Sequence, residues 1–385
     1  MPASAKQVIA LLAELIRIES VTPTLVPAGS GERSIARFIA DWLADIPVEV
    51  ELVEPVAGRT NVLARLRGTG RGPTLCLNAH TDTVGFEGWP DNALLPRVNG
   101  DQMFGLGASD DKSGCAAALH ALRSIAEAGV RMRGDLLVAL VADAEGVSVG
   151  SEHLAKTGSI DAAIVIEPQP LDHLVVEHQG FGWIDLITHG VAAHGSAPEA
   201  GVDAIVHMAE VITRLHRLDR TKFQSHPSLL NGRAVFHTAT ITGGTHYATY
   251  PDMARLGIAI GTQPGERLSD RIAEIEAIFS EVSKSEPGFR ADIVVKLDRE
   301  PFVAKGHEKL QKVVTWAVED VLGRKPQITG INAWRDAALM QAAGIPTLLM
   351  GSPGGNAHTV NEWTSISDLV KLSEILAKAA VAYLL

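Results

Sequence analysis

Residues Thr74–Val84 read Thr-Leu-Cys-Leu-Asn-Ala-His-Thr-Asp-Thr-Val, an apolar run that ends in a histidine and an aspartate. The run predicts a strand, so that His80 leaves the sheet at a carboxyl end, where open α/β sheets bind their ligands. His80 and Asp82 share one face of an extended chain, and Asp82 could orient a metal-bound His80 from behind. Such a pair in a loop is more often structural, and the segment alone indicates a site only weakly.

Apolar strands alternate with helices on both sides of this segment, which predicts an α/β sheet covered on both faces. We expect strands at 48–53, 61–66, 74–78, 135–142, 162–166 and 346–350. We expect helices at 33–44, 112–128, 150–156 and 307–321, with further helices starting near 336 and 366.

The middle of the chain has a different order of elements, β-α-β-β-α-β, which is the ferredoxin-like arrangement. Its expected strands are 181–188, 234–241, 253–260 and 289–297, and its expected helices are 202–218 and 268–283. We therefore predict a catalytic α/β/α domain with a mostly parallel central sheet, formed by residues 1–179 and 298–385. A smaller ferredoxin-like domain is inserted at 180–297.

Length and composition limit the class of protein. A chain of 385 residues suggests two domains, and 46% hydrophobic with 21% charged residues is typical of a globular protein. We expect no membrane span and no secretory signal. The net charge of −11 comes without a basic cluster, which argues against nucleic-acid binding. Two cysteines, Cys76 and Cys115, are too few for a disulfide framework and favour a cytoplasmic location.

A second motif, Gly-Leu-Gly-Ala-Ser-Asp-Asp-Lys-Ser-Gly, covers residues 105–114. Its glycines allow a tight loop and close approach of the backbone. Asp110 stands just ahead of an expected helix, and taken alone it is most simply a helix N-cap. A phosphate-binding loop is another interpretation, but the spacing differs from that of a P-loop.

Three further candidate ligands follow expected strands or a glycine-rich loop. Glu145 and Glu167 follow successive strands, and His358 follows the loop at 351–355. With His80 and Asp110 they bring two imidazoles and three carboxylates to one sheet edge. Mixed nitrogen and oxygen ligands suit zinc, cobalt or manganese better than calcium or magnesium. Five ligands suit two metal ions that share a bridging carboxylate.

These ordered motifs resemble, over essentially the whole chain, the di-zinc metallopeptidase family of aminoacylase, acetylornithine deacetylase, succinyl-diaminopimelate desuccinylase and bacterial glutamate carboxypeptidase. The resemblance implies that His80 and Glu167 hold one metal ion. It implies that Glu145 and His358 hold the other and that Asp110 bridges the two.

The resemblance also implies roles around the metal ions. Asp82 would support His80, and a glutamate beside the ions would carry the proton from water to the leaving amine. His194, in Val-Ala-Ala-His-Gly-Ser-Ala-Pro at 191–198, is similar to an oxyanion-hole donor delivered from the partner subunit of a homodimer. The inserted domain would then serve as lid and dimerisation domain.

The chain departs from the family pattern where Asp-Glu-Glu is expected, because it has Asp143-Ala144-Glu145. Glu145 keeps the ligand, but Ala144 stands in the position of the general base and cannot move a proton. Either the alanine was introduced to trap a bound substrate, or the natural protein has lost hydrolysis. The otherwise complete ligand set favours the first explanation.

Two more departures concern substrate recognition. Ala248 stands where the family usually has an asparagine, and Gly261 stands where many members have an arginine that resembles a clamp for the substrate carboxylate. Arg335, His246 and Arg233 are candidate replacements. Alternatively, the substrate lacks that carboxylate.

The sequence therefore predicts a two-metal hydrolase of amide bonds in N-acyl amino acids or small peptides, of the deacylase, dipeptidase or carboxypeptidase type. Without its general base it would be impaired or hold its substrate. The alternative is a metal-containing protein of the same fold that binds a small molecule without hydrolysing it.

Overall fold

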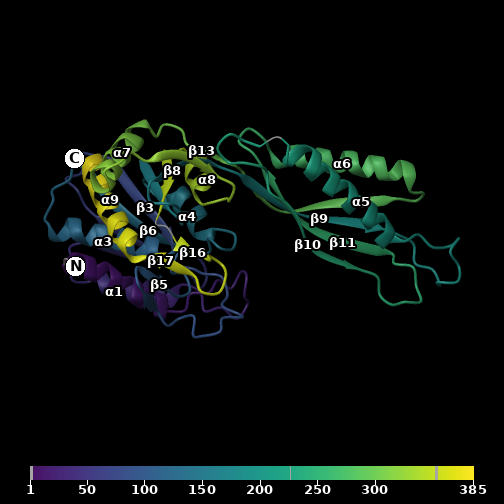
Figure 1. The fold of residues 1–385 in the computed structure, drawn as a ribbon, viewed down its shortest axis with the longest axis horizontal. Coiled ribbons are helices and arrows are strands. Elements are labelled where there is room, and N and C mark those ends of the chain that lie inside the picture. Colours follow the sequence, from purple (N-terminus) through teal and green to yellow (C-terminus); the bar gives the residue numbers. More distant parts are fainter. Residues whose placement is uncertain (1–2, 226, 352–353) are drawn as a thin grey trace. The chain divides into compact units, whose positions relative to one another are not determined.

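The computed structural model describes residues 3–225, 227–351 and 354–385, so part of the glycine-rich loop at 351–355 lies outside the described residues. The chain forms two compact units (Figure 1). The first comprises Met1–Val176, Ala304–Ile328 and Arg335–Leu385. The second comprises Glu177–Val303 and Thr329–Trp334, and it contains the segment expected as an insertion.

The first unit is built on a sheet with strand order β1-β2-β6-β3-β7-β15-β8. Its centre, β6-β3-β7-β15, is parallel, whereas β1, β2 and β8 join in antiparallel fashion. This confirms the predicted α/β class. The bounds are β1 (Glu49–Val56), β2 (Arg59–Leu66), β3 (Thr74–His80), β6 (Asp135–Val141), β7 (Ala162–Ile166), β8 (His173–His178) and β15 (Thr347–Met350).

Helices cover this sheet. Every residue of β3 is buried, which requires cover on both faces because successive side chains point to opposite sides. Helices α1, α3, α9 and α7 pack in series in that order, and α4 packs against α8. The bounds are α1 (Ala3–Arg17), α2 (Arg33–Leu43), α3 (Lys112–Glu127), α4 (Val149–Thr157), α7 (Glu308–Leu322), α8 (Ala337–Ala342) and α9 (Ile366–Leu384).

A small second sheet of the first unit, with order β16-β17-β5-β4, was not predicted. Its strands are too short to give a periodic signal. It joins segments more than 250 residues apart in the chain, because Trp363 pairs with Phe104. The bounds are β4 (Arg97–Asn99), β5 (Gln102–Phe104), β16 (Gly354–Gly355) and β17 (Trp363–Ser365).

The second unit has a four-stranded antiparallel sheet, β10-β11-β9-β12, with α5 and α6 on one face (Figure 1). Along the chain the order is β-α-β-β-α-β, as predicted. The bounds are β9 (Gly180–His189), α5 (Ala204–Leu218), β10 (Phe236–Gly243), β11 (Met253–Thr262), α6 (Leu268–Ser285) and β12 (Arg290–Arg299), with a π-helical turn η1 (Asp219–Phe223) after α5. Two further short strands, β13 (Phe302–Val303) and β14 (Gln327–Ile331), pair with β8 rather than with this sheet.

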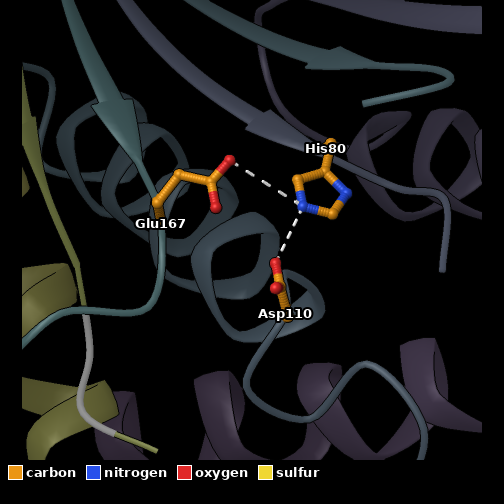
Figure 2. A group of neighbouring side chains, drawn as sticks. All are labelled: His80, Asp110 and Glu167. Atoms are coloured by element: carbon orange, nitrogen blue, oxygen red, sulfur yellow. Dashed lines mark hydrogen bonds and ion pairs between the residues drawn. The ribbon is translucent and has the colours of Figure 1, made fainter. Parts of the chain in front are cut away.

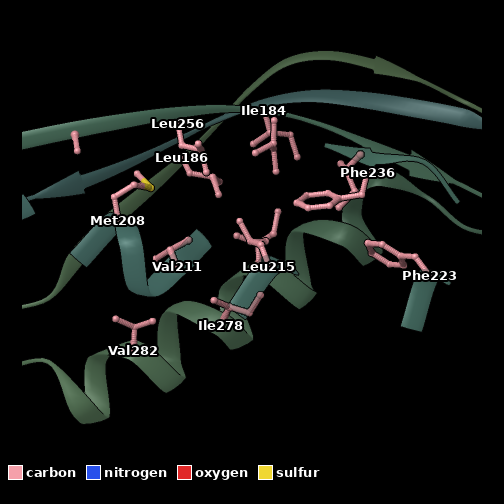
Figure 3. Packing of buried hydrophobic residues seen from close by; sticks show 14 of the residues in the cluster. Ile184, Leu186, Met208, Val211, Leu215, Phe223, Phe236, Leu256, Ile278 and Val282 are labelled. Atoms are coloured by element: carbon pink, nitrogen blue, oxygen red, sulfur yellow. The ribbon is translucent and has the colours of Figure 1, made fainter. Parts of the chain in front are cut away.

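The apolar core of the second unit lies between its helices and its sheet (Figure 3). Helix α5 places Met208, Val211 and Leu215 on one face, a helical spacing that points them at the sheet. The helix begins after Asp203, whose carboxylate accepts the N–H groups of Ile205 and Val206.

Within the described part of the chain, none of the helices has the length and apolarity needed to cross a membrane.

Candidate metal centre

The parallel strands of the first unit end at one edge of the sheet. His80 is the last residue of β3, and Glu167 follows β7 directly. Glu145 comes shortly after β6, and His358 comes after β15. Because these four strands run in the same direction, the residues that follow them collect at a common edge, where α/β sheets bind ligands.

The first cluster of possible ligands consists of His80, Asp110 and Glu167 (Figure 2). His80 Nε2 lies 3.0 Å from Asp110 Oδ1 and 3.9 Å from Glu167 Oε1. All three side chains are buried. Their ligand atoms lie within 4.8 Å of one another, a spacing at which a single ion could contact all three.

The second cluster consists of Asp110, Glu145 and His358. His358 Nε2 lies 2.8 Å from Glu145 Oε1 and 3.2 Å from Asp110 Oδ2. Asp110 therefore belongs to both clusters, with one carboxylate oxygen towards each imidazole. The structure brings together all five residues that the sequence analysis selected as ligands.

The donor set fits divalent metal ions. Three carboxylates share this pocket, and they hold the imidazoles in their charged form. Hydrogen bonds to Asp110 and Glu145 raise the pKa of His358 to about 10. Burial opposes the charge of His80, but Asp110 and Asp82 outweigh it and raise its pKa well above the usual range. Burial also raises the pKa of Glu167 to about 8. A bound cation would replace these protons, as metal binding to such ligands requires.

Asp110 does not act as the helix N-cap that its position suggested. Helix α3 begins after Asp111, and no side-chain cap hydrogen bond is formed there. The Asp110 side chain instead faces His80 and His358.

Asp82 supports two parts of the centre. Its backbone carbonyl lies 3.0 Å from His80 Nδ1, and its carboxylate lies 3.5 Å from the same atom. The same carboxylate accepts the N–H groups of Ala144 and Glu145 at 3.0 and 3.1 Å. Asp82 thus connects the strand end that carries His80 to the loop that carries Glu145.

A buried ion network supports that loop, and no motif in the sequence indicates it. Arg59 pairs with Glu32 and, at 2.7 Å, with Asp143. Asp143 has a left-handed backbone (φ 68°), and its carboxylate accepts the N–H of Val147. The arginine stands at the start of β2, and nothing in its local sequence indicates its partners.

Glu362 is a second supporting residue that the sequence did not reveal. Its buried carboxylate accepts the N–H groups of Gly107, Ser109 and Asp110 at 2.9, 2.7 and 2.8 Å. The loop within residues 105–114 thus forms an anion-binding nest, because its backbone N–H groups surround the carboxylate of Glu362. Burial raises the pKa of Glu362 to about 7, against the effect of these three N–H groups.

Arg335 lies at the first cluster. Its Nε is 2.9 Å from Glu167 Oε2, so its carboxylate partner is Glu167 rather than the adjacent Asp336. Asp336 is buried and accepts a hydrogen bond from Ser151 Oγ.

The other sequence candidates, His194, His246 and Arg233, belong to the second unit. The loops of His194 and His246 adjoin, because Gly195 N–H donates to Ala248 O at 2.8 Å and His246 Nε2 lies 3.2 Å from Thr249 Oγ1. His194 Nδ1 lies 2.8 Å from Ser196 Oγ. Arg233 is 3.9 Å from Asp219, in η1.

A mostly parallel α/β sheet with clustered histidine and carboxylate side chains at the carboxyl ends of its strands is typical of metal-dependent hydrolases. A model of the peptidase family M20/M25/M40 matches residues 76–382, and the chain belongs to this family of amide-hydrolysing enzymes.

Two relatives have the same sequence identity to this chain and match almost all of it. The N-formyl-4-amino-5-aminomethyl-2-methylpyrimidine deformylase of Bacillus subtilis is 28% identical, over 94% of this chain and 91% of the relative. The acetylornithine deacetylase of Photorhabdus laumondii is also 28% identical, over 96% and 95%.

Solved structures share the fold. A tripeptidase of Staphylococcus aureus has a TM-score of 0.82 at 22% identity, with 98% of each chain covered. A peptidase of Bacillus subtilis described as binding a dinuclear metal has a TM-score of 0.76 at 15% identity, with 100% and 99% covered.

Proposed function

We propose that the five clustered side chains hold two divalent metal ions. His80 and Glu167 would bind one ion, Glu145 and His358 the other, and Asp110 both. The observation that carries this proposal is the shared carboxylate, since each oxygen of Asp110 faces a different imidazole. We propose zinc as the resident metal, with cobalt or manganese able to replace it, because these ions accept mixed nitrogen and oxygen ligands.

The proposed reaction is hydrolysis of an amide bond in an N-acylated small molecule or a small peptide. Two relatives whose names describe removal of a formyl or an acetyl group support it. When bound, two divalent ions polarise an amide carbonyl and acidify water. Asp82 would hold His80 and the Glu145 loop in place. His194 would donate a hydrogen bond to the carbonyl oxygen as charge develops there, from the partner subunit of a homodimer.

Ala144 limits this reaction, because a methyl group cannot take a proton from water. We propose that alanine replaces a proton-carrying glutamate, so that the present chain binds its substrate but turns it over slowly. Ala144 is next to the proposed ligand Glu145, and its backbone N–H is held by Asp82, whose carboxylate also contacts His80.

Ala144→Glu tests this proposal, with Ala144→Gln as a control of similar shape that cannot carry a proton. Each protein, loaded with zinc, cobalt or manganese, would be given N-acyl amino acids, dipeptides and formamides, and released amine would be measured. We expect turnover to rise by about 10²–10⁴ in the Glu variant alone. If the Glu variant bound two ions but released no amine from any of these compounds, the hydrolase proposal would be contradicted.

A second candidate is a metal-containing protein that binds a small molecule without hydrolysis, and Ala144 as a native residue favours it. This function predicts that a substrate analogue binds equally well to the present chain and to Ala144→Glu, and that neither releases amine.

The usual carboxylate clamp is a poor model for this chain. A Cβ atom at Gly261 would lie 2.8 Å from Gln179 Oε1 and 2.9 Å from Val235 N, too close for any side chain without a shift. We propose that the substrate either lacks this carboxylate, like the pyrimidine named for the deformylase relative, or binds it through Arg335, His246 or Arg233.

Matched pairs of N-acyl amino acids and N-acyl amines would distinguish these two cases. Preference of Ala144→Glu for the amines supports the first. Preference for the acids, lost in Arg335→Met, His246→Ala or Arg233→Met, supports the second.

We also propose a reducing, cytoplasmic location, because Cys76 and Cys115 are both free and buried.

A further inference from the structure

The two oxygens of Glu167 have different partners. Oε1 faces His80 Nε2 at 3.9 Å, on the side of the proposed metal ion. Oε2 lies 2.9 Å from Nε of Arg335. One carboxylate thus connects an expected metal position to a fixed positive charge, and Figure 2 shows that its two oxygens point in different directions.

The position of Arg335 is set by the fold. Arg335 lies two residues before α8, and the residue between them, Asp336, is buried and hydrogen-bonded to Ser151 at the start of α4. Helices α4 and α8 pack against each other. The arginine side chain is 23% exposed and Glu167 only 5%, so water screens their interaction weakly.

The charge of Arg335 is permanent. A guanidinium stays protonated at any ordinary pH, and here burial opposes the charge while Glu167, Asp110 and Glu145 stabilise it. A guanidinium on one oxygen of a ligand carboxylate withdraws negative charge from it. It also repels a divalent cation on the other oxygen.

The second cluster differs in this respect. Among the described residues, Glu145 forms its direct ion pair with His358, and Arg335 acts on Glu145 only at longer range.

We propose that Arg335 is a built-in cation of the metal centre that weakens metal binding at the position formed by His80, Asp110 and Glu167. The two positions then fill unequally, and the position at Asp110, Glu145 and His358 fills first. This inference rests on the proposed two-metal centre, and it concerns the relative affinities of its two positions.

The test is a metal titration of the apo full-length chain with Zn²⁺ in competition with a chromophoric chelator, with bound metal counted by mass spectrometry. We expect one tight and one weaker ion in the present chain. In Arg335→Met and in Arg335→Gln the weaker ion should bind about tenfold to a hundredfold more tightly, as when one like charge is removed from a partly buried site. Arg335→Lys, which keeps the charge, should retain unequal binding.

Arg324→Met is the matched control, because Arg324 forms an exposed pair with Asp172 in the same unit. It should leave both affinities unchanged. The Glu145→Ala background shows at which position Arg335 acts, because it leaves only the position at His80 with its full set of ligands. In that background Arg335→Met should still tighten the binding of the remaining ion. Cooperative thermal unfolding of each apo variant shows that it is folded. If Arg335→Met does not fold, the affinities of Arg335→Gln decide the test.

Weaker metal binding in both neutral variants would mean that Arg335 orients Glu167 as a ligand, and it would overturn the proposal. Unchanged affinities with two ions bound would overturn it as well, while leaving the two-metal centre intact. Binding of no ion, or of only one ion in every variant, would overturn the two-metal centre itself and the role of Arg335 with it.

Discussion

The two halves of the metal centre are built in different ways. His80 and Glu167 stand at the ends of the central strands β3 and β7, and they are only 3% and 4% exposed. Glu145 and His358 stand on loops, and the His358 side chain is 46% exposed. The backbones of Asp143 and His358 are left-handed, with φ of 68° and 62°.

The difference shows what positions a ligand in each half. Sheet hydrogen bonds hold the strand-end ligands, so a buried strand is enough to place them. A loop has no such ladder, and its shape depends on side chains that bind its N–H groups. Asp82 and Asp143 do so here for the loop that carries Glu145, and Arg59 neutralises Asp143.

The largest expected effect comes from Arg59→Met, which tests whether the loop half depends on its ion network. The substitution leaves the carboxylates of Glu32 and Asp143 buried without their arginine. Breaking a buried pair in this way costs about 3–5 kcal/mol of the free energy of unfolding. Urea denaturation of the apo protein measures it.

Arg33→Met, which removes an exposed pair with Glu54, is the control for Arg59→Met and should cost less than about 1 kcal/mol. Equal costs for the two variants would show that the loop half does not rely on the buried network.

Asp110→Ala should weaken both halves at once, because Asp110 is the ligand they share. We expect both ions to be lost on dialysis, with each affinity reduced by more than about 100-fold, since a lost ligand should cost at least as much as a lost supporting partner. His80→Ala should remove one ion and leave the other. Retention of one tight ion by Asp110→Ala would show that the halves are independent.

Glu362→Gln tests a support common to both halves. The amide can accept hydrogen bonds through one atom only, so part of the nest at Gly107, Ser109 and Asp110 loses its acceptor. Metal affinity should fall by about 10–100-fold, the usual effect of losing such a supporting partner. The exposed Glu319→Gln is the control, and an affinity as high as that of the control would rule out a supporting role.

The smallest expected effect concerns the two cysteine thiols near His80, Cys76 in β3 and Cys115 in α3. Burial raises the pKa of Cys76 to about 12 and that of Cys115 well above its usual range. A raised pKa leaves little thiolate at pH 8, so the folded protein should react with a disulfide reagent only on opening. Reagent absorbance should show no fast phase in the native protein and two thiols in urea. A fast native phase would mean that the region around His80 opens readily.

The ligands of both halves could be selected from the sequence, whereas the side chains that support the loop half could not. The apolar runs before His80 and Glu167 identify strands, and the rule that parallel strands deliver ligands at their carboxyl ends then brings the two residues together. The β-α-β-β-α-β order of the second unit was likewise predicted, because its helices and strands have clear periods. The small sheet of β4, β5, β16 and β17 was not, because strands of two or three residues have no period.

The supports of the centre could not be predicted for a different reason. Glu362 binds a loop 252 residues away in the chain, Arg59 pairs with Asp143, and Arg335 pairs with Glu167. Each is an ordinary charged residue in its local sequence, where a solvated surface position is the simplest expectation.

The sequence by itself determined the order of the helices and strands, the residue types at the strand ends, and the alanine at 144. These are local properties, set by the spacing of apolar residues along a few turns or strands. Only the tertiary structure decided that Asp110 faces two imidazoles and that Glu362 binds the backbone of the loop within residues 105–114. It also decided that Arg335 contacts one oxygen of Glu167 while the other oxygen faces the proposed metal position. Those contacts join distant segments, and they exist only once packing of the sheet and helices has buried the charges side by side.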